Sequence, residues 1–255
     1  MKIEEKILSD KNIEQIIRKE VKDALTNNII NSFSSAHSTR SSKRSDELHL
    51  ALQIIAQKIF TPSSLSKNKI EINIDSNKSA TKIPAALGKS KSYSVDLLVK
   101  QNLKNKIAVE IAAPMSSLNK NYDNNQNKLI GRARRVFTHK ENIQNNLEFH
   151  QVDFLPNIAP VFDRAGNILN FEEVYIEDLE NNMDYDPSLI LPLLERQKVT
   201  NIIYEVNPEI YNLKFKTKKE LYDKMKSMDR EEIITKIDIS NISDFYNSIG
   251  RLIRK

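Results

Sequence analysis

Two short apolar segments decide the predicted fold: SYSVDLLV at residues 92–99 and IAVEIAAP at residues 107–114. Each is rich in aliphatic residues and bounded by polar ones, as is typical of a β-strand. The link between them, residues 100–106, is short, polar and rich in lysine. A link of this length favours an antiparallel hairpin over a parallel crossover.

Each predicted strand carries one acid in otherwise apolar surroundings, Asp96 in the first and Glu110 in the second. An unpaired carboxylate is costly to bury, so a cation or a proton usually compensates it. Two carboxylates that project from adjacent strands to the same side provide the hard oxygen ligands that Mg²⁺ prefers. The alternative is that both acids face solvent on a half-exposed hairpin, with Ala112 a core residue.

The spacing and surroundings of these acids resemble the PD-(D/E)xK nuclease superfamily, most closely the type II restriction endonucleases. Asp96 takes the place of the family's aspartate, and Glu110 that of the glutamate in Glu-x-Lys. The sequence departs from the pattern at two positions, because Ala112 stands where the lysine belongs and Val95 where a proline is usual. The resemblance covers the hairpin closely and residues 45–155 loosely.

The resemblance implies Mg²⁺-dependent hydrolysis of a DNA phosphodiester. It places Asp96, Glu110 and the backbone carbonyl of Ile111 around the metal, with Glu47, from a helix that precedes the sheet, serving a second metal site. The metal lowers the pKa of a bound water and neutralises charge on the phosphate. The family's lysine orients or deprotonates that water and stabilises the phosphate, and Ala112 can do neither. For Glu47 the alternative is an acid that favours the helix N-terminus.

Three explanations of Ala112 stay open. It is a substitution that inactivates the enzyme so that uncut DNA can be held, the lysine has moved to Lys100 or Lys106, or the protein binds DNA without cutting it. Strand alternation places residue 112 on the same face as Glu110, where the amine is needed. Restoring lysine at position 112 is the direct test.

Two basic segments are candidate DNA contacts. Residues 32–45 are polar and basic without periodicity, and side chains there can donate to phosphates and base edges. A helix expected from about residue 126 to residue 139 places three cations on one face, where their repulsion would be offset by phosphates. The candidate residues are Arg40, Lys43, Arg44, Lys128, Arg132 and Arg135. A flexible loop and a solvated basic face are the respective alternatives.

Composition bounds the remaining possibilities. The chain has 255 residues, no cysteine, four glycines and a net charge of +5. These values exclude disulfides and thiolate metal sites, leave no glycine-rich phosphate loop, and are compatible with a polyanionic partner. The charged N-terminal residues and the lack of a long apolar run predict no membrane partner, and the lack of cysteine predicts a cytoplasmic setting.

The expected fold class is α/β (α+β), a central mixed sheet flanked by helices with a restriction-endonuclease-like core. We expect one domain over residues 1–255: an N-terminal helix and basic loop at 1–45, a catalytic core at 46–155, and further strands and C-terminal helices at 156–255. The predicted partner is double-stranded DNA bound by a homodimer, since a palindromic target favours two-fold symmetry. The alternatives are a DNA-binding protein without catalysis and a repair or RNA nuclease of the same superfamily.

Overall fold

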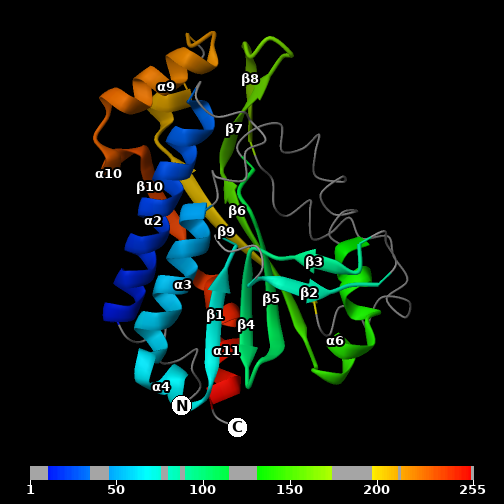
Figure 1. Ribbon diagram of the computed structural model, residues 1–255. Helices are drawn as coiled ribbons and strands as arrows, with labels where there is room; N and C mark the ends of the chain where they lie inside the picture. Colours follow the sequence, from blue (N-terminus) through cyan, green and yellow to red (C-terminus); the bar gives the residue numbers. More distant parts are fainter. Residues whose placement is uncertain are drawn as a thin grey trace.

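A six-stranded mixed sheet forms the centre of the molecule in the computed structural model (Figure 1). The structure describes residues 11–34, 46–75, 80–86, 90–114, 131–173, 197–211 and 214–253. The strand order is β1-β4-β5-β6-β9-β10, formed by β1 (Ile70–Ile74), β4 (Leu97–Gln101), β5 (Lys104–Ala112), β6 (Glu148–Pro156), β9 (Gln197–Val206) and β10 (Ile234–Asp238). Together with the helices that flank the sheet, this confirms the expected α/β class.

The predicted hairpin is present. β4 and β5 pair antiparallel, and β5 continues into parallel pairing with β6. The connection is a two-residue turn in which Asn102 and Leu103 both have positive φ, 51° and 64°. Positive φ at both central residues matches the right-handed twist of the two strands. The turn sets the pairing of Gln101 with Lys104, and a register shift between Lys100 and Val99 then sets the pairing further along the hairpin.

The first predicted strand, residues 92–99, is two strands. β3 (Ser92–Ser94) pairs with β2 (Lys82–Pro84) in a separate ribbon, and only then does the chain enter β4. The change of partner occurs at two successive residues: the Val95 N–H donates to the Thr81 carbonyl, and the Asp96 N–H donates to the Val109 carbonyl. Asp96 thus lies where the chain passes from the ribbon to the main sheet, which apolar periodicity alone does not reveal.

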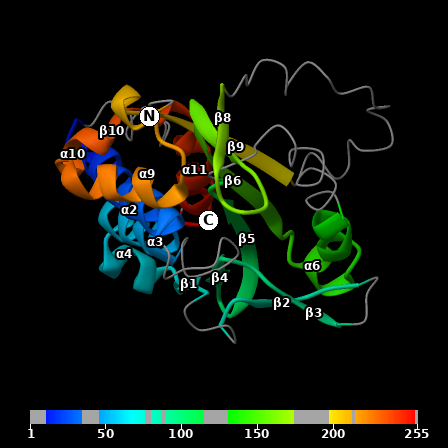
Figure 2. The ribbon, with the colours of Figure 1, turned by 90° about the horizontal axis from the view of Figure 1, so that it is seen from above.

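Each face of the sheet is covered by a different layer (Figure 2). The larger core packs α2 (Lys11–Phe33), α3 (Asp46–Phe60) and α11 (Ser243–Ile253) against one face. A smaller core on the other face joins β2, β3 and a helical segment at 131–137 to Leu98, Ala108 and Phe149. The second, smaller layer is the one that forms the candidate site.

The remaining elements extend this plan. They are α4 (Pro62–Lys67), α6 (Lys140–Gln144), β7 (Ile158–Phe162), β8 (Ile168–Glu173), the 3₁₀ turns η2 (Pro208–Tyr211) and η3 (Ser240–Ile242), α9 (Lys218–Ser227) and α10 (Arg230–Ile233). The sequence of residues 163–167 is typical of a turn and forms one between β7 and β8, with Gly166 at a φ of 90°. The sequence also favours a strand at 174–176 and a helix at 188–197. Residues 174–196 lie outside the described residues, and Gln197 begins β9. In the part of the chain that is described, no helix has the length and apolarity needed to span a membrane.

Candidate active site

The hairpin brings Asp96 and Glu110 together. Leu97 pairs with Val109, so Asp96, which precedes Leu97, lies opposite Glu110, which follows Val109. The Ile111 N–H donates to Oδ2 of Asp96 at 2.7 Å, which fixes the carboxylate against β5. Glu110 is buried, with 8% of its surface exposed. The two acids therefore lie close together, although Asp96 directly precedes β4 instead of lying within a strand as predicted, and the backbone of Ile111 lies beside the pair.

Asp96 destabilises the charge of Glu110. Burial, and then the charge of Asp96, raise the pKa of Glu110 to about 7, although the Arg132 guanidinium acts in the opposite direction. Burial also raises the pKa of Asp96, against the lowering effects of His49 and of the Ile111 hydrogen bond. Raised pKa values of two neighbouring acids indicate a site where nearby positive charge does not offset the cost of burial.

Arg132 and Tyr93 cover Glu110. Nη1 of Arg132 donates to Oε2 of Glu110 at 2.9 Å, and the arginine side chain is 42% exposed. The Tyr93 hydroxyl hydrogen-bonds the same carboxylate, and burial followed by that negative charge raises the pKa of Tyr93. The guanidinium carbons of Arg132 and Arg135 each lie 6.0 Å from the centre of the Tyr93 ring. Arg135 is held in turn by the carbonyls of Ala86 and Ser90.

Helix α3 contributes His49 rather than Glu47 to this region. Nε2 of His49 lies 3.9 Å from Oδ1 of Asp96, and the ring is buried with no hydrogen-bond partner at that nitrogen among the described residues. Glu47 accepts a hydrogen bond from Asn27 of α2, which also binds Arg230. A second metal site at Glu47 stays a prediction. The sequence analysis did not single out His49 as a site residue, although its place beside Leu48 and Leu52 on an apolar face was a usable signal.

Ala112 lies on the same face as Glu110, next to a polar pair on β6. Glu110 pairs with Gln151, and Ala112 pairs with Asp153. Gln151 donates to Oδ2 of Asp153, whereas Oδ1 is buried and without a partner in the described part of the chain. Burial raises the pKa of Asp153 to about 6, partly offset by the Gln151 hydrogen bond. The sequence analysis did not single out this acid, although its apolar neighbours on β6 are the same signal that identified Asp96 and Glu110.

The lysines considered as replacements for residue 112 lie elsewhere. Lys106 is on the correct face, but its Nζ donates to the Asn145 carbonyl, and it precedes Glu110 by four strand residues, roughly 13 Å. Lys100 is near the turn, in the last part of β4. Among the described residues, the cationic side chain that contacts Glu110 is that of Arg132.

The donor set fits a hard divalent cation. Mg²⁺ is usually bound through one or two carboxylates, with waters and substrate phosphates completing its coordination. Glu110 supplies a buried carboxylate and Asp96 a partly buried one, and Nε2 of His49, which has no hydrogen-bond partner among the described residues, lies 3.9 Å from Asp96. Within the described ranges, no group of three or more histidine, aspartate or glutamate side chains is placed to hold a metal. Other ligands would thus come from the backbone, water or the substrate.

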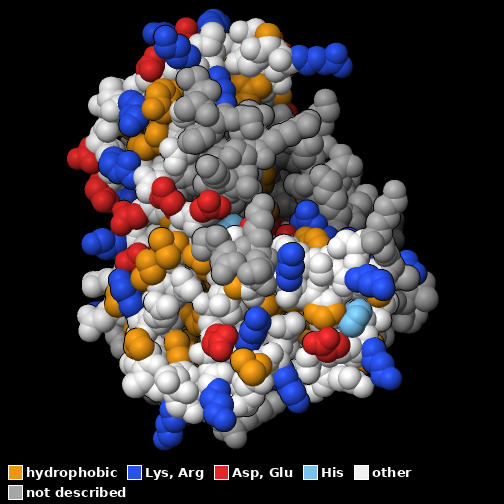
Figure 3. Space-filling model, in the orientation of Figure 1, with side chains coloured by type: hydrophobic (Ala, Val, Ile, Leu, Met, Phe, Trp, Pro, Cys, Tyr) orange, Lys and Arg blue, Asp and Glu red, His pale blue; other side chains and the backbone are white. Residues whose placement is uncertain are grey.

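The predicted DNA contacts are only partly described. Arg40, Lys43, Arg44 and Lys128 lie outside the described residues. Arg132 and Arg135 are described, but their side chains bind Glu110 and two backbone carbonyls, respectively. On the face seen in Figure 3, lysine and arginine side chains are interspersed with acidic ones.

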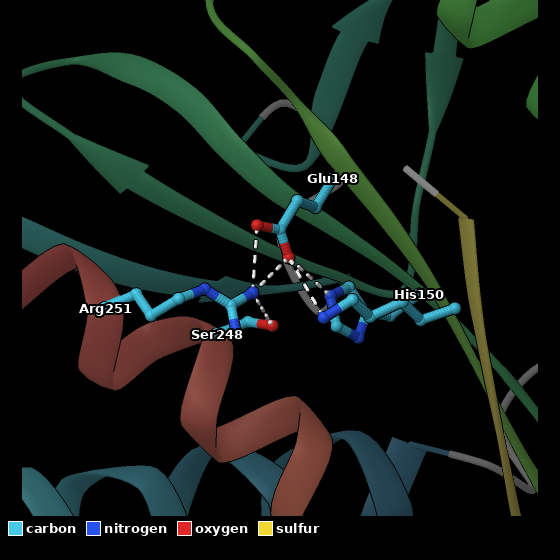
Figure 4. A network of polar contacts seen from close by, with 5 residues as sticks. Glu148, His150, Ser248 and Arg251 are labelled. Carbon is cyan, nitrogen blue, oxygen red and sulfur yellow. Dashed lines mark hydrogen bonds and ion pairs between the residues drawn. The ribbon is translucent and has the colours of Figure 1, made fainter. Parts of the chain in front are cut away.

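A second polar cluster lies on the opposite face of the sheet (Figure 4). Arg251 of α11 binds both carboxylate oxygens of Glu148, at 3.0 and 2.9 Å, and Ser248 contacts the same guanidinium. Burial alone would raise the pKa of Glu148, but hydrogen bonds from His150 and Arg251 outweigh it and lower the pKa to about 2. This cluster attaches the C-terminal helix to the start of β6, and we assign it a structural role.

Comparison with known proteins adds no relative. No protein-family model, no curated protein and no solved structure matches this chain.

Proposed function

We propose that this protein is a type II restriction endonuclease of the PD-(D/E)xK superfamily, which hydrolyses double-stranded DNA with Mg²⁺ and in which Ala112 impairs cleavage. The observation that carries the proposal is that Asp96, held by the Ile111 N–H, lies beside Glu110, whose pKa is raised to about 7 by burial and by the charge of Asp96. The restriction-endonuclease-like form of the core, the cytoplasmic setting and the homodimer belong to the same proposal.

Different residues of this chain would bind the metal and orient its ligands. Asp96 and Glu110 would hold Mg²⁺, which when bound supplies an acidified water and neutralises charge on the phosphate. The Ile111 N–H keeps the Asp96 carboxylate oriented, and the Tyr93 hydroxyl does the same for Glu110. A small side chain at 112 leaves no amine on the face where the family has one.

The test is cleavage of mixed-sequence plasmid DNA in Mg²⁺ by this chain and by Ala112→Lys. We expect the lysine variant to give discrete fragments at a rate about 100-fold or more above that of this chain, which is the usual effect of one positioned transition-state donor. Glu110→Gln in the lysine background is the matched control and should cut nothing. Lack of cutting by the lysine variant on DNA of varied sequence would contradict the proposal.

One observation favours the second candidate, a sequence-specific DNA-binding protein without catalysis: Ala112 occupies the lysine position. The two functions differ in how DNA affinity responds to Ca²⁺, which bridges carboxylates and phosphate without supporting cleavage. A nuclease site should bind DNA more tightly with Ca²⁺. A protein that binds without a metal site should show only the loss of affinity that added salt causes.

A further inference from the structure

We propose that Arg132 has taken over the position of the missing lysine and supplies the catalytic cation of this site. This inference deepens the proposed nuclease function and rests on it. The sequence assigned Arg132 to the DNA backbone as one of several cations on a helix. The structure instead directs its guanidinium at the carboxylate beside which the family places its amine.

The geometry supports this assignment in three ways. Nη1 of Arg132 lies 2.9 Å from Oε2 of Glu110, so the cation is in the site and not merely near it. The Tyr93 ring lies next to the guanidinium and its hydroxyl bonds the same carboxylate, which limits the arginine to this orientation. The side chain is also 42% exposed, so its remaining N–H groups can reach a ligand that arrives from solvent.

Ala112 leaves this face of β5 without a cation of its own. Residue 112 is on the same face of β5 as Glu110, and an alanine there carries no charge. Arg132 reaches the site from the helical segment 131–137, which packs on that face through Ala133 and Val136. A long side chain anchored on a packed helix can place a charge where the strand no longer carries one.

The chemistry of guanidinium sets what Arg132 can do. A guanidinium carries only N–H donors and no acceptor, so Arg132 cannot act as the general base. Its role is to donate to non-bridging phosphate oxygens as their negative charge increases. In the reaction the water oxygen bonds to phosphorus, and one ester P–O bond breaks with its electron pair leaving on that oxygen. The water releases one proton to solvent, and the leaving oxygen takes one proton from solvent.

The test compares this chain with Arg132→Ala, Arg132→Lys, Ala112→Lys and the double variant Ala112→Lys/Arg132→Ala. Single-turnover cleavage is measured in Mg²⁺, and DNA affinity is measured separately by fluorescence anisotropy in Ca²⁺. Arg134→Ala is the matched control, since Arg134 is an exposed arginine of the same helical segment. We expect Arg132→Ala to lower the cleavage rate about 100-fold, a typical loss for one transition-state donor, while DNA affinity stays within about threefold.

The other variants identify the cause. Arg132→Lys should recover part of the lost rate, the lysine at 112 should restore cleavage in the double variant, and Arg134→Ala should leave rate and affinity unchanged. Parallel loss of affinity and rate in Arg132→Ala would make Arg132 a backbone anchor and overturn the inference. An unchanged or increased rate would also overturn it, as would cleavage by Ala112→Lys with none by this chain. If no variant cleaves, the proposed function itself fails, and the two failures are therefore distinguishable.

Discussion

Asp153 is a buried acid outside the acid pair whose charge is poorly compensated. It is 8% exposed, one of its oxygens has no partner among the described residues, and its pKa is raised to about 6. The unfolded value is about 4, so the folded protein holds this proton more tightly than the unfolded chain does. The contribution to stability is therefore complete below about pH 4 and is lost as the pH rises through about 6.

Replacing Asp153 with Asn should remove that pH-dependent cost. Near pH 8 the variant should have a free energy of unfolding roughly 2 kcal/mol above that of the unmodified chain, with the advantage shrinking toward about pH 4. Urea unfolding at several pH values measures this. Asp163→Asn is the control, because the pKa of Asp163 is shifted in the opposite direction. Hydrogen bonds from Asn167 and neighbouring N–H groups lower that pKa, so the free energy of unfolding of this variant should not increase. A stability difference for Asp153→Asn that does not change with pH would contradict the account.

Glu110 predicts a pH dependence for metal binding. Its pKa is raised to about 7 by burial and by Asp96, so below that pH a proton competes with any cation for the carboxylate. The affinity for Mn²⁺ should fall about tenfold per pH unit below pH 7 and level off above it. Calorimetric titration between about pH 5.5 and pH 8.5 follows the change, and a constant affinity over that range would exclude Glu110 as a ligand.

At the scale of single elements, the strands β4 and β5 that position the site are joined by a turn whose residues do not favour its backbone conformation. Leu103 has a φ of 64°, so its backbone incurs the steric cost of the left-handed conformation. Its side chain is 82% exposed and therefore gains little stabilisation from burial. That cost is about 1–2 kcal/mol for a residue other than glycine.

Leu103→Gly should therefore raise the free energy of unfolding, by roughly 1 kcal/mol once the greater freedom of glycine in the unfolded chain is subtracted. Thermal or urea unfolding measures the change. Leu169→Gly is the matched control, because Leu169 is also exposed, at 65%, but lies within β8, where glycine weakens a strand. Destabilisation by both substitutions would show that the turn conformation is not the source of the strain.

The elements were predictable where a regular pattern of apolar residues continues long enough. The stripe in α3 and the apolar runs of β4, β5 and β6 predict those elements, and the acids within them predict the pair. The break at Val95 was not predictable, because it depends on which partner strand the backbone meets. The choice between Glu47 and His49 was difficult for a similar reason. The side chains of residues two apart in sequence point in directions that differ by roughly 200° around a helix axis. The orientation of α3 therefore decides which of the two residues faces Asp96.

The contact of Arg132 with Glu110 could not be predicted from the sequence. A basic face was evident from the spacing of Lys128, Arg132 and Arg135, and a phosphate was a reasonable partner for it. Which of these cations turns inward depends on β3, which places Tyr93 beside two guanidinium groups and Glu110. That ribbon forms only in the tertiary structure. Homodimer formation and the division of the chain into one domain stay predictions.

At the scale of the whole molecule, the sheet separates a structural face from a functional one. Three long helices bury the larger core on one face, and the Arg251–Glu148 contact fixes the last of them. The opposite face carries Glu110, Gln151 and Asp153 in register beside Ala112. This division predicts that substitutions on the first face change stability first, and that those on the second change metal binding and cleavage first.

Mn²⁺ binding, followed as the loss of the free-ion signal in electron paramagnetic resonance, tests the central claim most directly. We compare this chain with Asp96→Asn/Glu110→Gln, using as control Glu205→Gln, which removes an acid that is exposed and paired with Lys236. The account predicts that this chain and the control bind Mn²⁺ near pH 8 and that the double variant loses that site. Equal binding by all three proteins would contradict it.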